Sequence, residues 1–409
     1  MKILHVNEFY RDFGGTEKYL FDLCSALEQS GHQIVIISSS ENKHISVHGR
    51  KEYFVKPSYG LRSGLKMWGV YKSILEEEKP DIIHLHNTHY FISPFIIRKL
   101  MRFGPVVKFV HDARFFCPSL GRKIFYPSLE PCPYPVGYYC FNKKGCYPFD
   151  SEKGSLIANT YKFFLVYGEL LVSRKLDKII VGSHYMYDEL VRNGFNRQKI
   201  ELIPCFTDKG LGDSTSYPGK QNLVLCIGRF DEGKGMKEFI EALNYLKDFQ
   251  WSAVMVGDGK FMKDFEGKIH KFGLGEKIKL TGRLSAEDIA MCYKNCMMVV
   301  MPSLVPESFG LVGIEAMAFG KPVIAFDSGG IRDWLVDGDT GFLVRRGDIK
   351  GLAEKILQLL KDNSLASKMG GKGKKRVEEC YRKKIHVKRL LEVYDEVINS
   401  RAKKDKTVK

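Results

Sequence analysis

Two acidic residues, Glu307 and Glu315, stand on either side of a Ser-Phe-Gly-Leu turn. The turn follows the apolar run 297–301 and precedes a helical pattern over 312–319. A strand that passes through a tight turn into a helix presents backbone N–H groups and a positive dipole end to an anion. Two carboxylates would repel a lone phosphate, but they can hydrogen-bond hydroxyl groups beside it. We therefore expect a nucleotide-sugar as ligand and sugar transfer as the chemistry.

A second segment, residues 228–235, reads Gly-Arg-Phe-Asp-Glu-Gly-Lys-Gly and follows the apolar run 222–227. Arg229 can hold two oxygens at once, and Lys234 supplies a compact charge. A charge-assisted hydrogen bond contributes roughly 1.5–3 kcal/mol, so the two cations could stabilise a departing diphosphate. A surface turn with ordinary ion pairs is the alternative interpretation.

The elements that must position these segments alternate between strand and helix along the whole chain. Buried apolar strands in such a series are typical of parallel, doubly wound sheets, whose ligands bind beyond the carboxyl ends of the strands. We predict an α/β fold of two Rossmann-like domains, 1–207 and 208–384. The predicted strands are 2–6, 33–38, 82–86, 106–110, 178–181, 200–203, 222–227, 251–256, 277–280, 297–301 and 322–326.

Composition narrows the class of protein. The chain has 409 residues, 44% of them hydrophobic, which is enough for two buried cores. The first residues become polar too early for a signal peptide, and we find no apolar stretch of the roughly 18–20 residues that span a membrane. We expect a soluble, cytoplasmic protein.

The net charge of +16 suggests an anionic partner, and residues 372–409, with 14 Lys/Arg and 6 Asp/Glu, hold +8 of it. An anionic membrane surface, at about 1 kcal/mol per basic residue, would give reversible peripheral association. A solvated basic face is the plain alternative. A nucleic-acid-binding protein is the rival of another class, but we find no stacking platform or reading motif, so we expect no nucleic acid.

Several motifs together resemble glycosyltransferase family 4, whose members are retaining enzymes of the GT-B fold. Besides the two segments above, the resemblance includes Gly-Gly-Thr-Glu at 14–17, Asp-Ile-Ile-His-Leu-His-Asn at 81–87 and His-Asp at 111–112. It continues through Gly-Lys-Pro-Val-Ile at 320–324 and Asp-Gly-Asp-Thr-Gly at 337–341. It therefore covers nearly the whole chain. It implies that the two domains face each other across a cleft and that the last helix, 385–409, packs back on the first domain.

The resemblance implies a role for each matching residue. Four residues would be catalytic: Glu307, Arg229, Lys234 and His111. Glu307 would hydrogen-bond hydroxyls of the transferred sugar, Arg229 and Lys234 would bind the diphosphate, and His111 would lie across the cleft. Glu315 would hold the ribose, and Gly14 and Gly15 would let backbone approach the diphosphate and acceptor. The substrate-binding set is Gly14, Gly15, His86, Asn87, Asp112, Gly228, Arg283, Ser308, Phe309, Gly310, Leu311 and Glu315.

The implied reaction moves a hexose-type sugar from a UDP- or GDP-sugar to a hydroxyl, with retention of configuration. Fixed positive charge would stabilise the leaving diphosphate beside an oxocarbenium-like sugar. The family has no agreed enzymatic nucleophile, and the favoured account is a same-face reaction in which the leaving phosphate takes the acceptor proton. His111 or Asp112 could assist, or His111 could hydrogen-bond a sugar hydroxyl. No cofactor is required for catalysis, because Asp-Gly-Asp at 337–339 is better explained as a turn than as a metal motif.

The acceptor implied by the family's habits is a saccharide, lipid-linked, in cell-surface polysaccharide or glycolipid synthesis. A sugar-nucleotide epimerase or a phosphorylase of the same fold is a nearer rival. A phosphorylase would need a lysine for pyridoxal phosphate, and we find no context for one.

Histidines and cysteines leave questions open. We expect His84 and His86, on one strand, to face opposite sides, with His86 and Asn87 toward the cleft; two structural histidines are the alternative.

Four cysteines lie close together in a loop rich in Pro, Tyr and Gly, in a Cys-Pro insertion that some family members share. They could hold a structural zinc ion, remain free thiols or form disulfides. These are Cys117, Cys132, Cys140 and Cys146.

Overall fold

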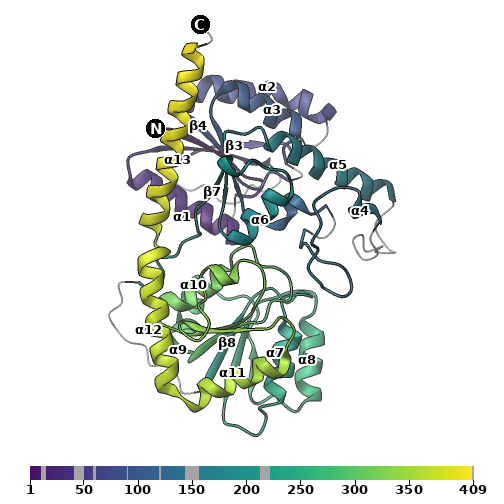
Figure 1. Ribbon diagram of the computed structural model, residues 1–409, viewed down its shortest axis with the longest axis vertical. Helices are drawn as coiled ribbons and strands as arrows, with labels where there is room; N and C mark the ends of the chain where they lie inside the picture. Colours follow the sequence, from purple (N-terminus) through teal and green to yellow (C-terminus); the bar gives the residue numbers. More distant parts are fainter. Residues whose placement is uncertain are drawn as a thin grey trace. The chain divides into compact units, whose positions relative to one another are not determined.

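The computed structural model describes residues 1–10, 15–40, 50–58, 61–89, 91–118, 121–142, 156–211 and 222–407. The chain divides into two compact units (Figure 1). The first unit contains Met1–Cys205 and Lys383–Lys409, and the second contains Phe206–Arg382. The divisions fall two residues before each predicted boundary, after 205 rather than 207 and after 382 rather than 384.

The first unit is built on a seven-stranded parallel sheet of order β3-β2-β1-β4-β5-β6-β7. The order reverses between β1 and β4, so this pair marks the switch point of the sheet. The strands are β1 (Lys2–Val6), β2 (Gln33–Ser39), β3 (Lys51–Val55), β4 (Ile82–Leu85), β5 (Val106–Val110), β6 (Lys178–Val181) and β7 (Ile200–Leu202). The helices are α1 (Gly15–Gln29), α2 (Leu61–Glu78), α3 (Pro94–Phe103), η2 (Ala113–Phe116), α4 (Tyr139–Asn142), α5 (Leu156–Ser173), α6 (His184–Arg192), η3 (Arg197–Lys199) and α13 (Lys383–Thr407).

The second unit repeats the plan with a six-stranded parallel sheet of order β10-β9-β8-β11-β12-β13. Its switch point lies between β8 and β11. The strands are β8 (Leu223–Ile227), β9 (Ser252–Val256), β10 (Ile278–Leu280), β11 (Met298–Met301), β12 (Val323–Phe326) and β13 (Gly341–Val344). The helices are α7 (Met236–Asn244), α8 (Met262–Lys271), α9 (Ala286–Asn295), α10 (Leu311–Ala318), η4 (Gly330–Asp333), α11 (Ile349–Lys361) and α12 (Asn363–Cys380).

The predicted α/β fold is confirmed, and every predicted strand is present with ends that differ by at most one residue. Two strands were missed, β3 and β13, and both lie at the edge of their sheet. The first of them, β3, is only partly buried, so its sequence lacks the continuous apolar run that marked the others. Lys-Glu-Tyr-Phe-Val in β3, where only Val55 is buried, shows this.

The last helix, α13, belongs to the first unit, where it packs along α1 (yellow beside purple in Figure 1). Three hydrogen bonds attach it to the rest of the unit. His386 Nε2 lies 2.7 Å from the Tyr19 hydroxyl, and His386 Nδ1 lies 2.7 Å from the carbonyl oxygen of Pro204. The Tyr394 hydroxyl lies 2.6 Å from His84 Nδ1.

Within the described part of the chain, no helix combines the length and the apolar character that a bilayer crossing requires.

Candidate active site

The loops that follow β8 and β11 lie against each other at the switch point of the second unit. The carbonyl oxygen of Gly233 accepts hydrogen bonds from the backbone N–H groups of Leu304 and Val305, at 2.9 and 3.1 Å. Gly235 has φ +73°, and a Cβ atom there would stand 1.7 Å from the carbonyl oxygen of Pro302. Only glycine permits this approach, and it brings Lys234 to the loop that carries the acidic residues.

Lys234 and Glu307, which are far apart in sequence, form an ion pair at this point. Lys234 Nζ donates to Glu307 Oε1 at 2.6 Å, and Ser303 Oγ donates to the same oxygen at 2.5 Å. Burial alone would raise the pKa of Glu307, but the charge and hydrogen bond of Lys234, the Ser303 hydroxyl and the Arg229 charge together hold the pKa below its usual value. Glu307 is therefore a carboxylate at neutral pH, beside a cation.

The backbone of Glu307 is held by a third loop, which follows β12. The N–H of Gly330 donates to the Glu307 carbonyl oxygen at 2.7 Å, and a Cβ atom at Gly329 would stand 2.3 Å from that oxygen. Arg346, at the end of β13, donates to the carbonyl oxygen of Leu304 at 3.3 Å. Loops from four neighbouring strands therefore position one carboxylate.

The residues between the two acids lead directly into α10. Phe309 is buried against Tyr381, with ring centroids 5.9 Å apart, and its carbonyl oxygen accepts from Trp334 Nε1 at 2.6 Å. Anchored in this way, the segment of Ser308 and Gly310 turns so that α10 begins at Leu311. The positive end of the α10 dipole thus lies next to the Lys234–Glu307 pair.

Glu315, in the second turn of α10, is held by two residues that sequence reasoning did not select. Lys209 Nζ donates to Glu315 Oε1 at 2.5 Å, and the buried Tyr293 hydroxyl donates to Oε2 at 3.2 Å. Neither residue belongs to a motif, so only the folded chain reveals them.

Two arginines near this site are well exposed. The Arg229 side chain is 71% exposed and pairs with Asp231 at 3.1 Å. The Arg283 side chain is 66% exposed and lies 3.6 Å from Asp258. Such exposed pairs are weak, so either guanidinium can turn to a ligand at small cost. The loop after β9 packs against Gly228, which directly follows β8. A Cβ atom added at Gly257 would stand 1.8 Å from the Gly228 carbonyl oxygen.

Substituting Gly235 with alanine tests the loop contact. We expect a loss of about 2 kcal/mol or more in the free energy of unfolding, because the methyl group would overlap Pro302 and the backbone has a positive φ. Gly267→Ala is the control, because a Cβ atom at Gly267, within α8, would contact nothing within 4 Å. Denaturant unfolding measures both variants, and equal stabilities would contradict the close approach.

The first unit places His111 and Asp112 directly after β5. The Asp112 carboxylate binds Arg114 in a bidentate manner, with Nε and Nη2 at 3.0 and 2.8 Å from Oδ2 and Nε at 3.1 Å from Oδ1. Burial would raise the pKa of Asp112, but Arg114 outweighs it and lowers the pKa. This carboxylate is thus engaged as the partner of a cation. Gly15 begins α1, and Gly14 lies outside the described residues.

The prediction that His84 and His86 face opposite sides was wrong. Both side chains are buried, at 0% and 1% exposure, and their ring centroids lie 4.1 Å apart. Residues two positions apart on a strand lie on the same face, so both point toward His5 of β1. The ring nitrogens of His86 lie 2.9 Å from His5 Nδ1 and 3.0 Å from His111 Nε2, so His86 contacts histidines on both sides.

Asn87 and Glu8 lie at the carboxyl ends of β4 and β1, at the switch point of the first unit. Asn87 is 3% exposed, and its Nδ2 has no hydrogen-bond partner among the described residues. Glu8 was missed by sequence reasoning. Its N–H donates to the Asn87 carbonyl oxygen at 2.8 Å, and burial raises the pKa of its carboxyl to about 7.

The predicted cysteine cluster is only partly described. Cys117 and Cys140 are buried and Cys132 is half-buried, while Cys146 lies outside the described residues. Within the described ranges, the group of three metal-ligating side chains that lie within reach of one ion is His5, His84 and His86, not these cysteines. The structural zinc ion stays a prediction.

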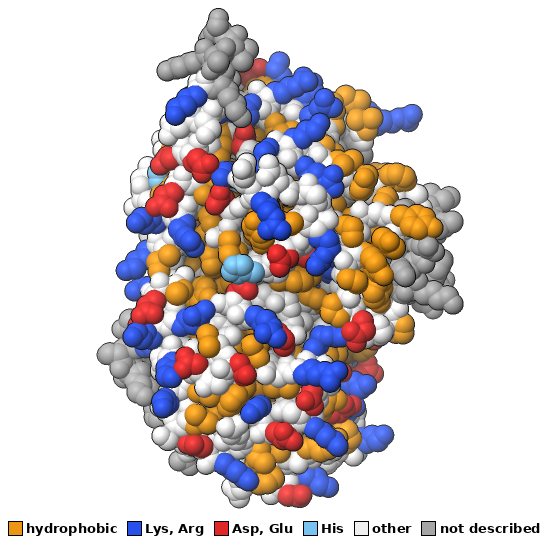
Figure 2. Space-filling view, viewed as in Figure 1, with side chains coloured by type: hydrophobic (Ala, Val, Ile, Leu, Met, Phe, Trp, Pro, Cys, Tyr) orange, Lys and Arg blue, Asp and Glu red, His pale blue; other side chains and the backbone are white. Residues whose placement is uncertain are grey.

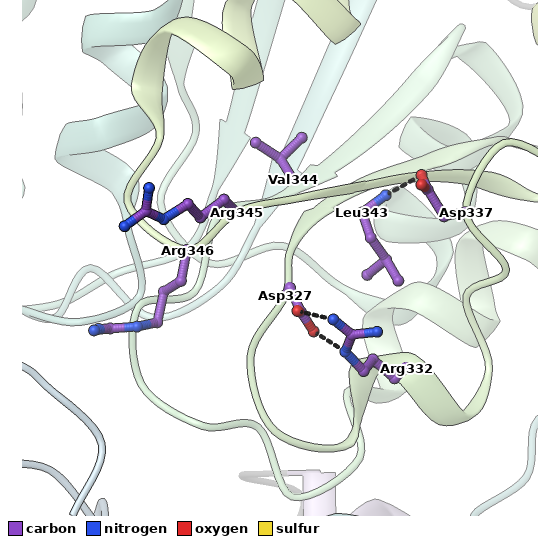
Figure 3. A pocket seen from close by; sticks show the side chains of 7 residues that line it. All are labelled: Asp327, Arg332, Asp337, Leu343, Val344, Arg345 and Arg346. Carbon is purple, nitrogen blue, oxygen red and sulfur yellow. Dashed lines mark hydrogen bonds and ion pairs between the residues drawn. The ribbon is translucent and has the colours of Figure 1, made fainter.

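A shallow pocket of about 420 Å³ lies beside the ends of β12 and β13 in the second unit (Figure 3). In it Arg332 is paired with Asp327, with Nε 2.6 Å from Oδ1. Asp337 accepts from the N–H of Leu343 at 2.9 Å, so the first aspartate of Asp-Gly-Asp serves the turn that precedes β13. Of the three arginines that line the pocket, Arg332 is paired with Asp327, and Arg346 is the residue that donates to the Leu304 carbonyl oxygen of the neighbouring loop.

Comparison with known families identifies the class of protein. Residues 13–210 match the family described as glycosyltransferase family 4, and residues 213–376 match the glycosyl transferases group 1. The two matches together cover most of the chain. The protein belongs to the group 1 glycosyltransferases and is an enzyme of that class.

Two of three curated relatives are similar over nearly the full length, and the third over part of it. An uncharacterized glycosyltransferase of Methanocaldococcus jannaschii is 26% identical over 91% of this chain and 92% of its own. The N-acetyl-alpha-D-glucosaminyl L-malate synthase of Bacillus anthracis is 27% identical over 95% and 96%. The capsular polysaccharide biosynthesis glycosyltransferase CapM of Staphylococcus aureus is 31% identical over 58% and 66%.

Among solved structures, Anabaena HepE in complex with UDP and glucose is similar with a TM-score of 0.72 and 19% identity, over 97% of this chain and 99% of that one. The similarity supports the GT-B fold.

Proposed function

We propose that the protein transfers a hexose-type sugar from a nucleoside-diphosphate donor to a saccharide hydroxyl, with retention of configuration. The observation that carries the proposal is the Lys234–Glu307 pair, which four loops hold at the switch point of the second unit. The pair stands beside the starts of α7 and α10. A diphosphate needs the cation and the helix starts, and the sugar hydroxyls need the carboxylate.

Each residue has a role in this reaction. Lys234 and the exposed Arg229 neutralise charge that develops on the leaving diphosphate, where fixed dipoles and cations have their largest effect on rate. Glu307 accepts hydrogen bonds from the sugar and keeps Lys234 in place. Glu315, held by Lys209 and Tyr293, accepts from the ribose hydroxyls. The leaving phosphate takes the acceptor proton on the same face of the sugar. Asp112 does not serve as the base in this proposal, because its carboxylate is engaged by Arg114.

The acceptor we propose is a lipid-linked saccharide of a cell-surface polysaccharide or glycolipid, at an anionic membrane surface. The printed function of the Staphylococcus aureus relative, capsular polysaccharide biosynthesis, supports this proposal. So do exposed apolar side chains on the first unit, among them Tyr161, Phe164 and Leu171 of α5. On the face shown in Figure 2, hydrophobic side chains gather over α4 and α5, while acidic and basic side chains are intermixed elsewhere.

Ligand-induced stabilisation tests the donor site. UDP or GDP is expected to raise the melting temperature of the protein, because a ligand at 100 times its Kd adds about 2.7 kcal/mol to stability. We expect the two nucleotides to differ in the size of this effect. Arg229→Ala should weaken this shift without lowering the melting temperature of the free protein, since Arg229 is exposed. Arg332→Ala is the matched control, with a similarly exposed guanidinium paired to Asp327 in the same unit. Equal nucleotide shifts in the two variants would remove Arg229 from the donor site.

A further inference from the structure

Three histidines form a continuous hydrogen-bonded row across the sheet of the first unit. His5 Nδ1 lies 2.9 Å from His86 Nε2, and His86 Nδ1 lies 3.0 Å from His111 Nε2. His5 and His86 are buried, while His111 is partly exposed at the end of the row. The row therefore leads from the protein interior to His111, which directly follows β5 at the carboxyl edge of the sheet.

The protons in such a row must all point the same way. A neutral imidazole carries one N–H and one acceptor nitrogen, so a donor at one link makes the next ring a donor as well. Two arrangements exist. In one, each Nδ1–H donates toward His111, whose own Nδ1–H remains to donate outward. In the other, each Nε2–H donates inward, and the row ends at Nε2–H of His5.

The buried end of the row distinguishes the two arrangements. His5 Nε2 has no hydrogen-bond partner among the described residues. In the inward arrangement this atom would be a buried N–H without an acceptor, whereas in the outward arrangement it is a lone pair. Orphaned buried N–H groups are rarer in native proteins than unused acceptor capacity. The outward arrangement is thus the one that the interior stabilises.

The surroundings favour neutral rings. Burial lowers the pKa of His5 and of His111 to about 3, and it also lowers the pKa of His86. The charges that act on the two buried rings are cationic, Arg50 on His5 and Lys108 on His86. The same cations disfavour a divalent ion among His5, His84 and His86, and the direct bond between His5 and His86 already uses one nitrogen of each ring.

We propose that His5 and His86 are positioning residues that fix His111 as its Nδ1–H tautomer, so that His111 presents an N–H donor to a ligand at the carboxyl edge of the first sheet. The assignment of a saccharide as that ligand rests on the proposed function. The tautomer itself does not. His111 then acts as a donor that orients the ligand, and it does not take the acceptor proton.

The tautomer is directly measurable in the wild-type protein. With histidine labelled in the ring nitrogens, two-bond proton–nitrogen correlation spectra distinguish Nδ1–H, Nε2–H and imidazolium forms, and His111→Gln identifies the signals of His111. We expect His111 to carry its proton on Nδ1 from pH 6 to 8, before any ligand is added. An Nε2–H pattern, or an imidazolium in that range, would overturn the proposal. So would a stoichiometric metal ion in the purified protein.

A pair of variants tests the coupling. His5→Phe keeps an aromatic ring but removes the inner end of the row. His84→Phe is the matched control, since His84 lies in the same cluster but bonds to Tyr394 rather than to the row. We expect His111 to become a mixture of tautomers in His5→Phe and to stay Nδ1–H in His84→Phe. Unchanged His111 signals in a folded His5→Phe variant would refute the coupling.

Activity gives a second readout. We expect kcat/KM for the donor to fall about three- to tenfold in His5→Phe and less than twofold in His84→Phe, the size expected for one misdirected hydrogen bond. Equal losses in the two variants would mean that the row acts only through packing. A wild-type protein that turns over no nucleotide-sugar would defeat the proposed function, while the spectra would still decide the tautomer.

Discussion

Replacing Glu307 with alanine is expected to reduce donor turnover by a factor of about 10³ or more. The change removes the acceptor for the sugar hydroxyls and also the partner that holds Lys234 Nζ at 2.6 Å. Losing one preorganised electrostatic contact costs about 10²–10³ in kcat, and here two are lost together. The release of nucleoside diphosphate from labelled donor measures turnover. Near-wild-type activity would exclude Glu307 from the donor site.

Two further variants separate chemistry from stability. Glu307→Gln keeps the size of the side chain and an acceptor for Ser303 but removes the charge, so we expect a loss of activity close to that of Glu307→Ala. Glu241→Ala is the matched control, because Glu241 pairs with Lys268 at 2.6 Å in the same unit and is 25% exposed. This variant should retain activity. If it loses as much as Glu307→Ala, the effect reflects ion pairs in general.

The architecture of the protein was predictable because it depends on local patterns. Parallel strands buried on both faces read as short apolar runs, and the carboxyl ends of those runs mark where ligands bind in doubly wound sheets. The candidate residues Lys234 and Glu307 were found at two such ends, and the structure brings them together. The edge strand β3 was missed for the same reason, since its burial is partial.

Contacts that depend on register or on the return of the chain could not be read from local patterns. His5 lies opposite His84 only because β1 and β4 pair in that register. His386 reaches Tyr19 only because α13 packs along α1. One signal was available for the histidines: residues two apart on a strand share a face, so His84 and His86 had to point the same way. Lys209 and Tyr293 carried no signal of any kind.

Lowering the pH from 7.5 to 5.0 is expected to destabilise the first unit by about 4 kcal/mol or more. Burial lowers the pKa of His5 and of His111 to about 3 and of His386 to about 4, whereas an unfolded histidine titrates near 6.5. The unfolded chain therefore binds more protons below pH 6.5, and stability that is fully present above this pH is lost as the pH falls. At about 1.4 kcal/mol per pKa unit, each buried histidine costs roughly 2 kcal/mol at pH 5.

Glu8 changes the stability in the opposite direction as the pH falls, and this makes the prediction specific. Burial raises its pKa to about 7, so its protonation below that pH favours the folded state and offsets about one of the histidines. Denaturant unfolding at pH 7.5 and 5.0 measures the loss. His5→Phe should make the pH dependence shallower, and Glu8→Gln should make it steeper, because each removes one titrating group. A free energy of unfolding that stays constant between the two pH values would contradict neutral, buried histidines, and with them the row of hydrogen bonds that ends at His111.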